Sequence, residues 1–577
     1  MTHAAGQAAA GRTSRQAVGR PPRRTTEARA RRAAPAAPAK RLAEEPERPT
    51  RLAVVIVVPA VLALAVGLWD LGGPPPWRDE AATASAAGRT LPQLAHLLQS
   101  VDAVHGLYYA LMHVVAGLSG AGEVALRLPS VVAGALAAAG TGAIGRALGV
   151  PRAGLYGGAL LALMPIFSRY VQEARPYALT VAAAVGVTLL LLRLMRSPTS
   201  GVLAAYAAAL TMLAYLNLFA FLLAGAHGLA VILSQGPLLR WACAVTPALA
   251  AVTPLAWLGS RQSAQVAWIP RPEAADVGTL AVRLSGDLGG ATGPGVAPLT
   301  WALVLFGLVY AAVAGVRRAR DARGLPATAA GHAEATAGGR SERPWAAGPG
   351  GTPSAGAASF GHAALVRLTL PWLLVPALVL LAASWAVHPV YVFRYVFCCV
   401  PAAALLAGAG LATLPPGLGG AVLTAWLGLS VPGHFATRGP DGRQDDPRPV
   451  MALLAADAKP GDGVLFVPAK VRKYETVYPS VFGRLRDVAL ARSPERDGSF
   501  PGREVGPRVL AARLDGLRTL WVVGQTGKTA MPARRRALVE RSFAPAGRWT
   551  FRGMFVDRYD RYDPRPAHRS NGAGVGK

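Results

Sequence analysis

The feature that most constrains this chain is a series of apolar blocks, each about 17–22 residues long, which is the length a helix needs to cross the hydrocarbon core of a bilayer. Only 16% of the 577 residues are charged, whereas a soluble protein of this length normally carries about 25%. The mean hydropathy is +0.33. The sequence therefore predicts a mainly α, polytopic membrane protein with a helix bundle.

Eleven spans are expected, and the basic loops between them indicate their orientation. The spans fall near residues 52–69, 125–145, 153–169, 177–195, 201–216, 218–234, 241–258, 298–316, 366–387, 392–412 and 418–434. Residues 1–51 are rich in Ala, Pro and Arg, so we expect a disordered cytoplasmic tail. The positive-inside rule then places the loop 70–124 outside the plasma membrane and the Gly-rich and Ala-rich loop 317–365, expected to be disordered, inside. Together, residues 52–434 form the predicted transmembrane catalytic domain.

The formal net charge of +29 lies in the tail, the loops and the C-terminal segment, and the spans are almost uncharged. That distribution is typical of a membrane protein, and we expect no nucleic-acid partner. Three cysteines all lie in apolar runs (Cys243, Cys398, Cys399), so we expect neither a disulfide framework nor a metal site built from them.

Residues 435–577 differ in character from the bundle. Short β-like runs, "GVLFVP" (463–468) and "TLWVVG" (519–524), alternate with amphipathic runs such as "RPVMALLAADA" and "ARRRALVERSF". Alternating strand and helix signals over about 140 residues predict a small α/β domain with its own core, outside the membrane.

Acids, arginines and aromatic residues gather on the predicted outer face. They come from "WRDE" in the first outer loop, "SRYVQEARPYAL" between the third and fourth spans, "AWIPRP" after the seventh, and "HPVYVFRYV" between the ninth and tenth. Such a group of residues suits a substrate with an anionic head and a long lipid tail at the outer leaflet. Transfer of a sugar from a polyprenyl phosphate to a hydroxyl would need a carboxylate to take the acceptor proton and fixed cations for the departing phosphate. We expect Asp79 to be the base and Arg175 and Arg394 to bind phosphate, because an arginine fork matches phosphate oxygens and stays charged.

Other candidates have structural alternatives. The catalytic group includes Glu80 and Asp102, although adjacent helix residues point about 100° apart and Asp102 suits a helix N-cap. Arg127 is predicted to be among the donor-binding residues, and its structural alternatives are pairing with a first-loop carboxylate or anchoring the chain at the membrane surface. The remaining predicted donor-binding residues are Tyr177, Tyr395, Trp268 and His105.

These segments resemble the GT-C superfamily of membrane glycosyltransferases, in its branch of protein mannosyltransferases and aminoarabinose transferases (glycosyltransferase family 39-like, actinobacterial type). The resemblance rests on "DE" at 79–80, "VDAVHGLYYALMH", "GEVALRLPSVVAG", "QEARPYAL" and "FRYVF", in that order over residues 52–412. It implies an inverting transfer from a polyprenyl-phosphate donor, usually mannose-bearing, with Asp79 as base. This chain has "HGLY" where family members often have "HPPL".

The alternative from another class is a transporter or flippase of lipid-linked substrates, which would show inverted repeats and charged, broken helices at mid-membrane. A receptor would explain the outer domain but not the acidic pair. The acceptor is open between a protein, a glycolipid and a wall glycan. No cofactor is certain, and a divalent metal stays open.

Overall fold

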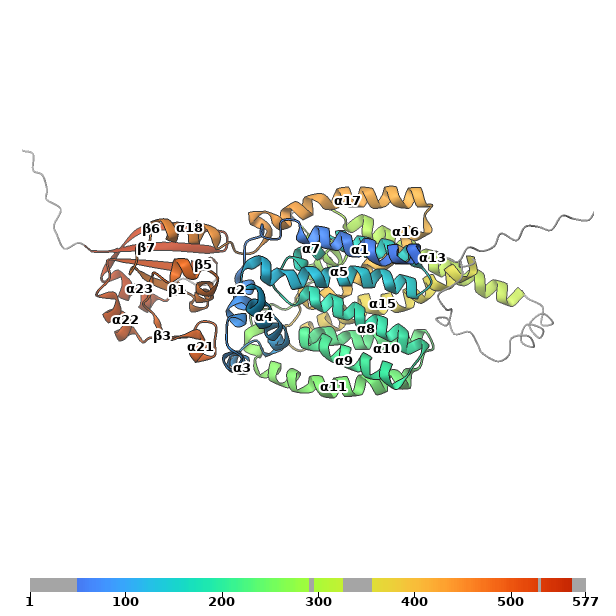
Figure 1. Ribbon diagram of the computed structural model, residues 1–577, viewed down its shortest axis with the longest axis horizontal. Helices are drawn as coiled ribbons and strands as arrows, with labels where there is room; N and C mark the ends of the chain where they lie inside the picture. Colours follow the sequence, from blue (N-terminus) through green and yellow to red (C-terminus); the bar gives the residue numbers. More distant parts are fainter. Residues whose placement is uncertain (1–48, 290–294, 325–354, 528–530, 563–577) are drawn as a thin grey trace, which may run out of the picture. The chain divides into compact units, whose positions relative to one another are not determined.

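The computed structural model describes residues 49–289, 295–324, 355–527 and 531–562. Within these ranges, the segment up to residue 438 forms a helix bundle and the C-terminal segment forms a sheet covered by helices (Figure 1). The predicted fold class, a membrane helix bundle with a small C-terminal α/β domain, is confirmed. The predicted tail lies outside the described residues except for 49–51, which belong to the first helix.

The helices of the bundle follow the predicted apolar blocks. They are α1 (Pro49–Leu68), α5 (Glu123–Ala147), α6 (Pro151–Leu163), α7 (Pro165–Val171), α8 (Tyr177–Arg196), α9 (Ser200–Leu216), η2 (Leu218–Leu222), α10 (Leu223–Leu233), α11 (Leu238–Arg261), η3 (Ser263–Val266), α12 (Ala274–Leu284), α13 (Ala297–Gly324), α15 (Ala355–Ala386), η4 (Phe393–Tyr395), η5 (Phe397–Cys399), α16 (Val400–Thr413) and α17 (Pro416–Arg438). Five of the described helices are long and apolar enough to cross a membrane, namely α5, α8, α11, α13 and α15. A membrane location follows, while the count of eleven spans stays a prediction.

Small residues let the central helices approach closely. Helix α16 packs against α6 and α13, and α5 packs against α1, α6 and α8. A Cβ atom added at Gly408 of α16 would lie 2.4 Å from the backbone nitrogen of Gly157 in α6, so only glycine fits there. Close backbone approach of this kind is how helices associate in lipid, where apolar side chains gain little from burial.

The loop predicted to be disordered between the eighth and ninth spans (317–365) is shorter in the structure. Helix α13 continues to Gly324 and α15 begins at Ala355, so both helices extend into the predicted loop. Residues 325–354 lie outside the described residues. Apolar periodicity continues only weakly into these basic and Gly-rich stretches, so the sequence pattern does not mark the ends of the two helices.

The first predicted outer loop is itself helical. It contains α2 (Arg78–Ala87), α3 (Leu91–Ser100), η1 (Ala103–His105) and α4 (Gly106–Ser119). Helix α4 exposes an apolar stripe of Leu107, Leu111, Val114 and Leu118. A helix with one exposed apolar face suits the boundary between membrane and water.

The C-terminal domain is a three-layer α/β structure. Its five-stranded sheet has the order β2-β1-β5-β7-β6, in which β1 is parallel to β2 and β5 while β7 is antiparallel to β5 and β6. Strands β3 and β4 form a separate antiparallel pair. The strands are β1 (Gly463–Val467), β2 (Arg486–Asp487), β3 (Leu490–Arg492), β4 (Arg503–Glu504), β5 (Thr519–Gln525), β6 (Phe543–Phe551) and β7 (Met554–Arg561).

Both faces of this sheet are buried, because successive side chains point to opposite sides of a strand. Val464 and Phe466 of β1 enter one core, and Leu465 and Val467 enter the other. The helices and turns of this domain are η6 (Pro440–Gly442), α18 (Arg448–Asp457), η7 (Ala469–Lys473), α19 (Tyr474–Val477), α20 (Pro479–Phe482), α21 (Pro494–Asp497), α22 (Pro507–Leu514) and α23 (Ala533–Glu540). The predicted strands at 463–468 and 519–524 are β1 and β5, and the two amphipathic runs are α18 and α23.

Candidate active site

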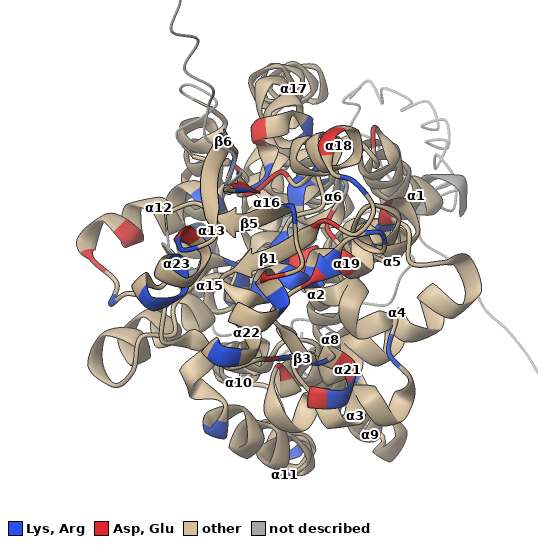
Figure 2. Cartoon of the chain, turned by 90° about the vertical axis from the view of Figure 1, so that its left-hand side faces the viewer, with Lys and Arg blue, Asp and Glu red and all other residues tan. Residues whose placement is uncertain are grey.

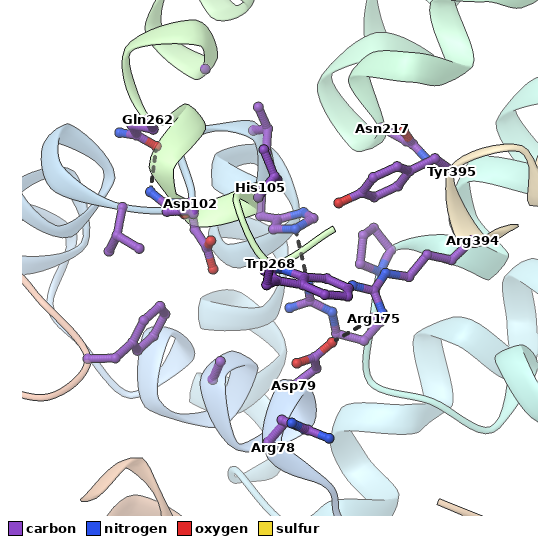
Figure 3. A pocket seen from close by; sticks show the side chains of 18 of the residues that line it. Arg78, Asp79, Asp102, His105, Arg175, Asn217, Gln262, Trp268, Arg394 and Tyr395 are labelled. Carbon is purple, nitrogen blue, oxygen red and sulfur yellow. Dashed lines mark hydrogen bonds and ion pairs between the residues drawn. The ribbon is translucent and has the colours of Figure 1, made fainter. Parts of the chain in front are cut away.

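A cavity of about 1060 Å³ lies where the bundle, the first outer loop and the C-terminal domain meet. Figure 2, turned so that the C-terminal domain faces the viewer, shows acidic and basic segments gathered around α2 and α19. The cavity brings together most of the predicted site residues, several of which are labelled in Figure 3: Asp79, Asp102, His105, Arg175, Tyr177, Trp268, Arg394 and Tyr395. Two predicted residues, Glu80 and Arg127, are not among its lining residues.

Asp79 is in the first turn of α2, which begins at Arg78 after the N-cap residue Trp77. The three prolines at 74–76 do not belong to this helix, because a proline disfavours the helical conformation of the residue before it. The Asp79 carboxylate faces the cavity, and its side chain is 24% exposed. Its nearest cation is Arg394, whose Nη1 lies 3.9 Å from Asp79 Oδ2, too far for a hydrogen bond (Figure 3). Burial by itself would raise the pKa of Asp79, but Arg175, Arg394, Lys473 and Arg78 outweigh it and hold that pKa below its usual value. Asp79 is therefore an ionised carboxylate that is not locked into an ion pair.

Glu80 has the opposite environment. Its oxygens accept two hydrogen bonds of 2.8 Å from Arg127 Nε and Nη2, and Oε1 also accepts one of 2.8 Å from the backbone N–H of Ala174. Arg127 donates further to the carbonyl oxygens of Leu71 and Pro74. Glu80 thus ties the first outer loop to α5 and to the segment before α8, instead of facing the cavity.

Arg175 is fixed by two groups from the first outer loop. Its Nη2 lies 3.0 Å from His105 Nε2, and its Nη1 donates to the Tyr109 hydroxyl at 3.3 Å. Since an arginine only donates, His105 Nε2 accepts and the ring proton is on Nδ1. Burial and the neighbouring Arg175 lower the pKa of His105 to about 4, so the ring is neutral at neutral pH. His105 therefore orients Arg175 without opposing its charge.

Asp102 lies at the edge of the same group of residues. It accepts a hydrogen bond of 2.7 Å from the Tyr109 hydroxyl. It occupies the N-cap position of η1 but makes no side-chain capping bond, and its backbone is left-handed (φ 56°). Gln265 accepts its backbone N–H at 3.2 Å, and Gln262 accepts the next one, from Ala103, at 2.9 Å. These contacts attach the segment after α11 to the first loop.

The far wall of the cavity is aromatic. The Arg394 guanidinium lies 5.6 Å from the centre of the Trp268 ring and 5.8 Å from that of Tyr395. Tyr177 opens α8 and packs edge-on against Tyr170, with ring centres 5.2 Å apart. Rings beside a cation suit recognition of a sugar next to a phosphate.

Sequence reasoning missed the C-terminal domain's share of the cavity. Nine of the residues that line it come from this part of the chain: Gln444, Asp445, Lys470, Val471, Lys473, Tyr474, Phe500, Gln525 and Met554. One signal was present, because the chain has six lysines against 54 arginines and two of the six lie in "VPAKVRKYE". Across the described ranges, no group of three or more His, Cys, Asp or Glu side chains has the geometry of a metal site.

Comparisons with known proteins give similarity to solved structures only. No family model and no curated protein matches the chain. ArnT from Cupriavidus metallidurans in the apo state is 14% identical, with a TM-score of 0.48 over 87% of this chain and 97% of ArnT. The same ArnT bound to undecaprenyl phosphate is 12% identical, with a TM-score of 0.46 over 88% of this chain and 98% of ArnT.

An oligosaccharyltransferase from Archaeoglobus fulgidus, in complex with Zn and sulfate, is 11% identical, with a TM-score of 0.41 over 82% of this chain and 68% of that protein. With identities and TM-scores this low, we base the proposed function on the residues of the cavity.

Proposed function

We propose that this chain is an inverting glycosyltransferase that moves a sugar from a polyprenyl-phosphate donor to an acceptor hydroxyl at the outer face of the plasma membrane. The observation that carries the proposal is the shared cavity of Asp79, Arg175 and Arg394, in which the carboxylate is ionised and not locked by either arginine. A free carboxylate beside two fixed cations is what this transfer requires.

Asp79 is the general base. It takes the proton of the acceptor hydroxyl as the acceptor oxygen forms a bond to the anomeric carbon of the sugar. The bond from that carbon to the donor phosphate breaks on the opposite side, so the configuration inverts. The products are the glycosylated acceptor and polyprenyl phosphate, and the proton on Asp79 passes to solvent.

Arg175 and Arg394 stabilise the charge that develops on the departing phosphate. Arg175 is held in place by His105 and Tyr109, and Arg394 by the surrounding rings, so neither has to reorganise during the reaction. Asp102 acts through Tyr109. Glu80 and Arg127 position α2 and do not touch the substrate in this scheme.

The remaining lining residues suit a lipid-linked donor. Part of the cavity wall is apolar, with Leu216, Leu218, Phe219 and Val390 from the bundle and Val104 from the first outer loop. Such a wall accommodates the first isoprene units, and the rest of the chain lies in the bilayer. The orientation, with the N-terminus inside and the C-terminal domain outside, follows from the basic loops.

The sugar and the acceptor need direct testing. Mannose is the first donor sugar to test, because it is the usual one in the family that the motifs resemble. The acceptor is a hydroxyl of a secreted protein, a glycolipid or a wall glycan.

The experiment is transfer of labelled sugar from polyprenyl-phosphate mannose by the purified full-length protein in bilayers, beside Asp79→Asn. Transfer or slow donor hydrolysis by the wild type alone supports the proposal. Equal turnover by Asp79→Asn overturns Asp79 as the base. No turnover with any polyprenyl-phosphate sugar, together with movement of the lipid across the bilayer, would favour a flippase instead.

A further inference from the structure

The C-terminal domain is attached directly to the helix that carries Asp79. Gln444 accepts a hydrogen bond of 2.6 Å from Arg78 Nη2, and Asp445, whose side chain is only 2% exposed, makes the buried part of the attachment. Its Oδ2 accepts the backbone N–H of Arg78 at 3.0 Å, and its Oδ1 accepts Arg78 Nε at 3.2 Å. The Tyr474 hydroxyl donates to the same Oδ2. Asp445 therefore stabilises the N-terminus of α2 and holds α19 against it.

This attachment brings Lys473 next to Asp79. Lys473 ends η7 and directly precedes Tyr474, while Asp79 directly follows Arg78, and both η7 and α19 pack against α2. Lys473 lines the cavity together with Asp79 and is partly buried. Among the cations that act on Asp79, its electrostatic effect follows those of Arg175 and Arg394 and exceeds that of Arg78.

The ammonium group of Lys473 makes no direct contact with a counter-ion among the residues that the structure describes. Within the described ranges it forms neither a hydrogen bond nor an ion pair, and the nearby carboxylate of Asp445 is bonded to Arg78 and Tyr474 instead. A partly buried cation that no carboxylate contacts directly loses hydration without full compensation, and a ligand can supply the missing negative charge. Burial accordingly lowers the pKa of Lys473 to about 8, despite the favourable effect of Asp79 and Asp445.

The residue type supports a role in binding. No lysine occurs between residues 41 and 458, whereas arginine is abundant there. Lysine presents a compact, flexible charge that can follow a moving phosphate, whereas arginine presents a fixed planar fork. Lysine at this position therefore differs from the fixed arginines on the other side of the cavity.

We propose that Lys473 is a further catalytic residue, supplied by the C-terminal domain, whose ammonium group binds the phosphate of the polyprenyl-linked donor and stays with it as it leaves. This inference rests on the proposed function. It makes the C-terminal domain part of the active site and not only an appended module.

The proposal has a pH dependence with a definite sign. Only protonated Lys473 attracts phosphate, so affinity is full below pH 8 and falls as pH rises through the pKa of about 8. The charged groups that act on this ammonium are Asp79 and Arg78 on α2, Asp445 before α18 and Asp102 before η1. Bound phosphate adds negative charge and raises the pKa of Lys473 in the complex, so binding above pH 8 is accompanied by proton uptake.

The test measures binding of undecaprenyl phosphate, and of undecaprenol as the uncharged control, to full-length protein in bilayer nanodiscs across this pH range. The variants are Lys473→Met and Lys473→Arg, with Lys459→Met as matched control, because Lys459 is an exposed lysine of the same domain. We expect Lys473→Met to weaken phosphate binding about 10-fold to 100-fold at neutral pH, as loss of a charge-assisted contact does, without changing undecaprenol binding. Lys473→Arg should bind at neutral pH and lose the decline above pH 8, and Lys459→Met should match the wild type.

Three results would overturn the inference. Wild-type affinity in Lys473→Met shows that the ammonium does not meet the phosphate. A decline above pH 8 that persists in Lys473→Arg assigns the titration to another group. Failure of the wild type to bind undecaprenyl phosphate at any pH removes both this inference and the proposed donor, whereas the first two results leave the donor intact. Lys473→Arg also controls for folding, because it retains the charge and most of the side-chain length.

Discussion

The two sides of helix α2 use neighbouring carboxylates in opposite ways. On the side facing the bundle, Glu80 and Arg127 are 5% and 0% exposed and joined by two hydrogen bonds of 2.8 Å. On the side facing the cavity, Asp79 and Arg394 are 24% and 17% exposed and 3.9 Å apart. One pair is closed, and the other leaves room for a substrate between its members.

The difference shows how a site can keep a reactive group free without losing rigidity. A closed, buried pair holds the helix in place, because removing either partner leaves an uncompensated charge. The open pair can then keep its carboxylate available, since the position of α2 does not depend on it.

The largest effect is expected on activity at Asp79. Asp79→Asn keeps the shape of the side chain but cannot take a proton, so transfer should fall about 10²-fold to 10⁴-fold. The thermal unfolding midpoint should fall much less than in Glu80→Gln, because the Asp79 carboxylate interacts with the surrounding cations only at a distance and accepts no hydrogen bond from the described residues. Labelled-sugar transfer and thermal unfolding on the same preparation test both statements. A large loss of stability would mean that Asp79 is structural, like its neighbour.

The same change from carboxylate to amide at Glu80 should lower stability much more than the change at Asp79 does. Glu80→Gln leaves Arg127 buried without a counter-ion, and we expect about 3–5 kcal/mol of lost unfolding free energy. Burial favours the neutral form of Glu80, but Arg127 outweighs it and lowers the pKa of Glu80. The stabilisation is therefore complete above the ordinary glutamate pKa and is lost as pH falls through the lowered one. Denaturant titration of both proteins in detergent measures the difference, with Asp79→Asn as the matched control.

Asp79→Glu should close the open pair. One additional methylene brings the carboxylate within hydrogen-bonding distance of Arg394 and moves it away from the acceptor. Misplacement by about 1 Å lowers rates about 10-fold to 100-fold, and we expect a loss of that size with stability unchanged. Steady-state transfer rates at saturating donor measure it. Full activity would show that the 3.9 Å separation has no role in the reaction.

The comparison also separates what the sequence predicts from what it cannot. The bundle, the α/β domain and the convergence of Asp79, His105, Arg175 and Arg394 follow from apolar block length, strand alternation and loop orientation. These signals are local or depend only on which side of the membrane a loop faces. The assignment of Glu80 to a buried pair depends on the rotation of α2, which apolar patterning does not determine in a helix as rich in alanine as this one.

The attachment of the C-terminal domain to α2 cannot be predicted from the sequence, for a different reason. Asp445 and Arg78 are 367 residues apart, and no pattern along the chain pairs them. The same holds for Lys473, which lines the cavity with Asp79 only because the C-terminal domain packs on α2. The scarcity of lysine was visible, but the location of those lysines required the fold.

The smallest effect on transfer activity is expected at His105, which acts on the site only by orienting Arg175. His105 must be neutral to accept the hydrogen bond from Arg175, so wild-type transfer should fall as pH drops through about 4. Gln in its place retains an acceptor oxygen but does not titrate. His105→Gln should therefore remain within a few-fold of wild type at neutral pH, and its loss of activity should move to the lower pH at which Asp79 takes a proton. Transfer rates measured over the acid range test this. As a control, the activity of each sample is measured again after return to neutral pH, to confirm that the loss is reversible. If both proteins lose activity at the same pH, another group causes the loss, and His105 is only a packing residue.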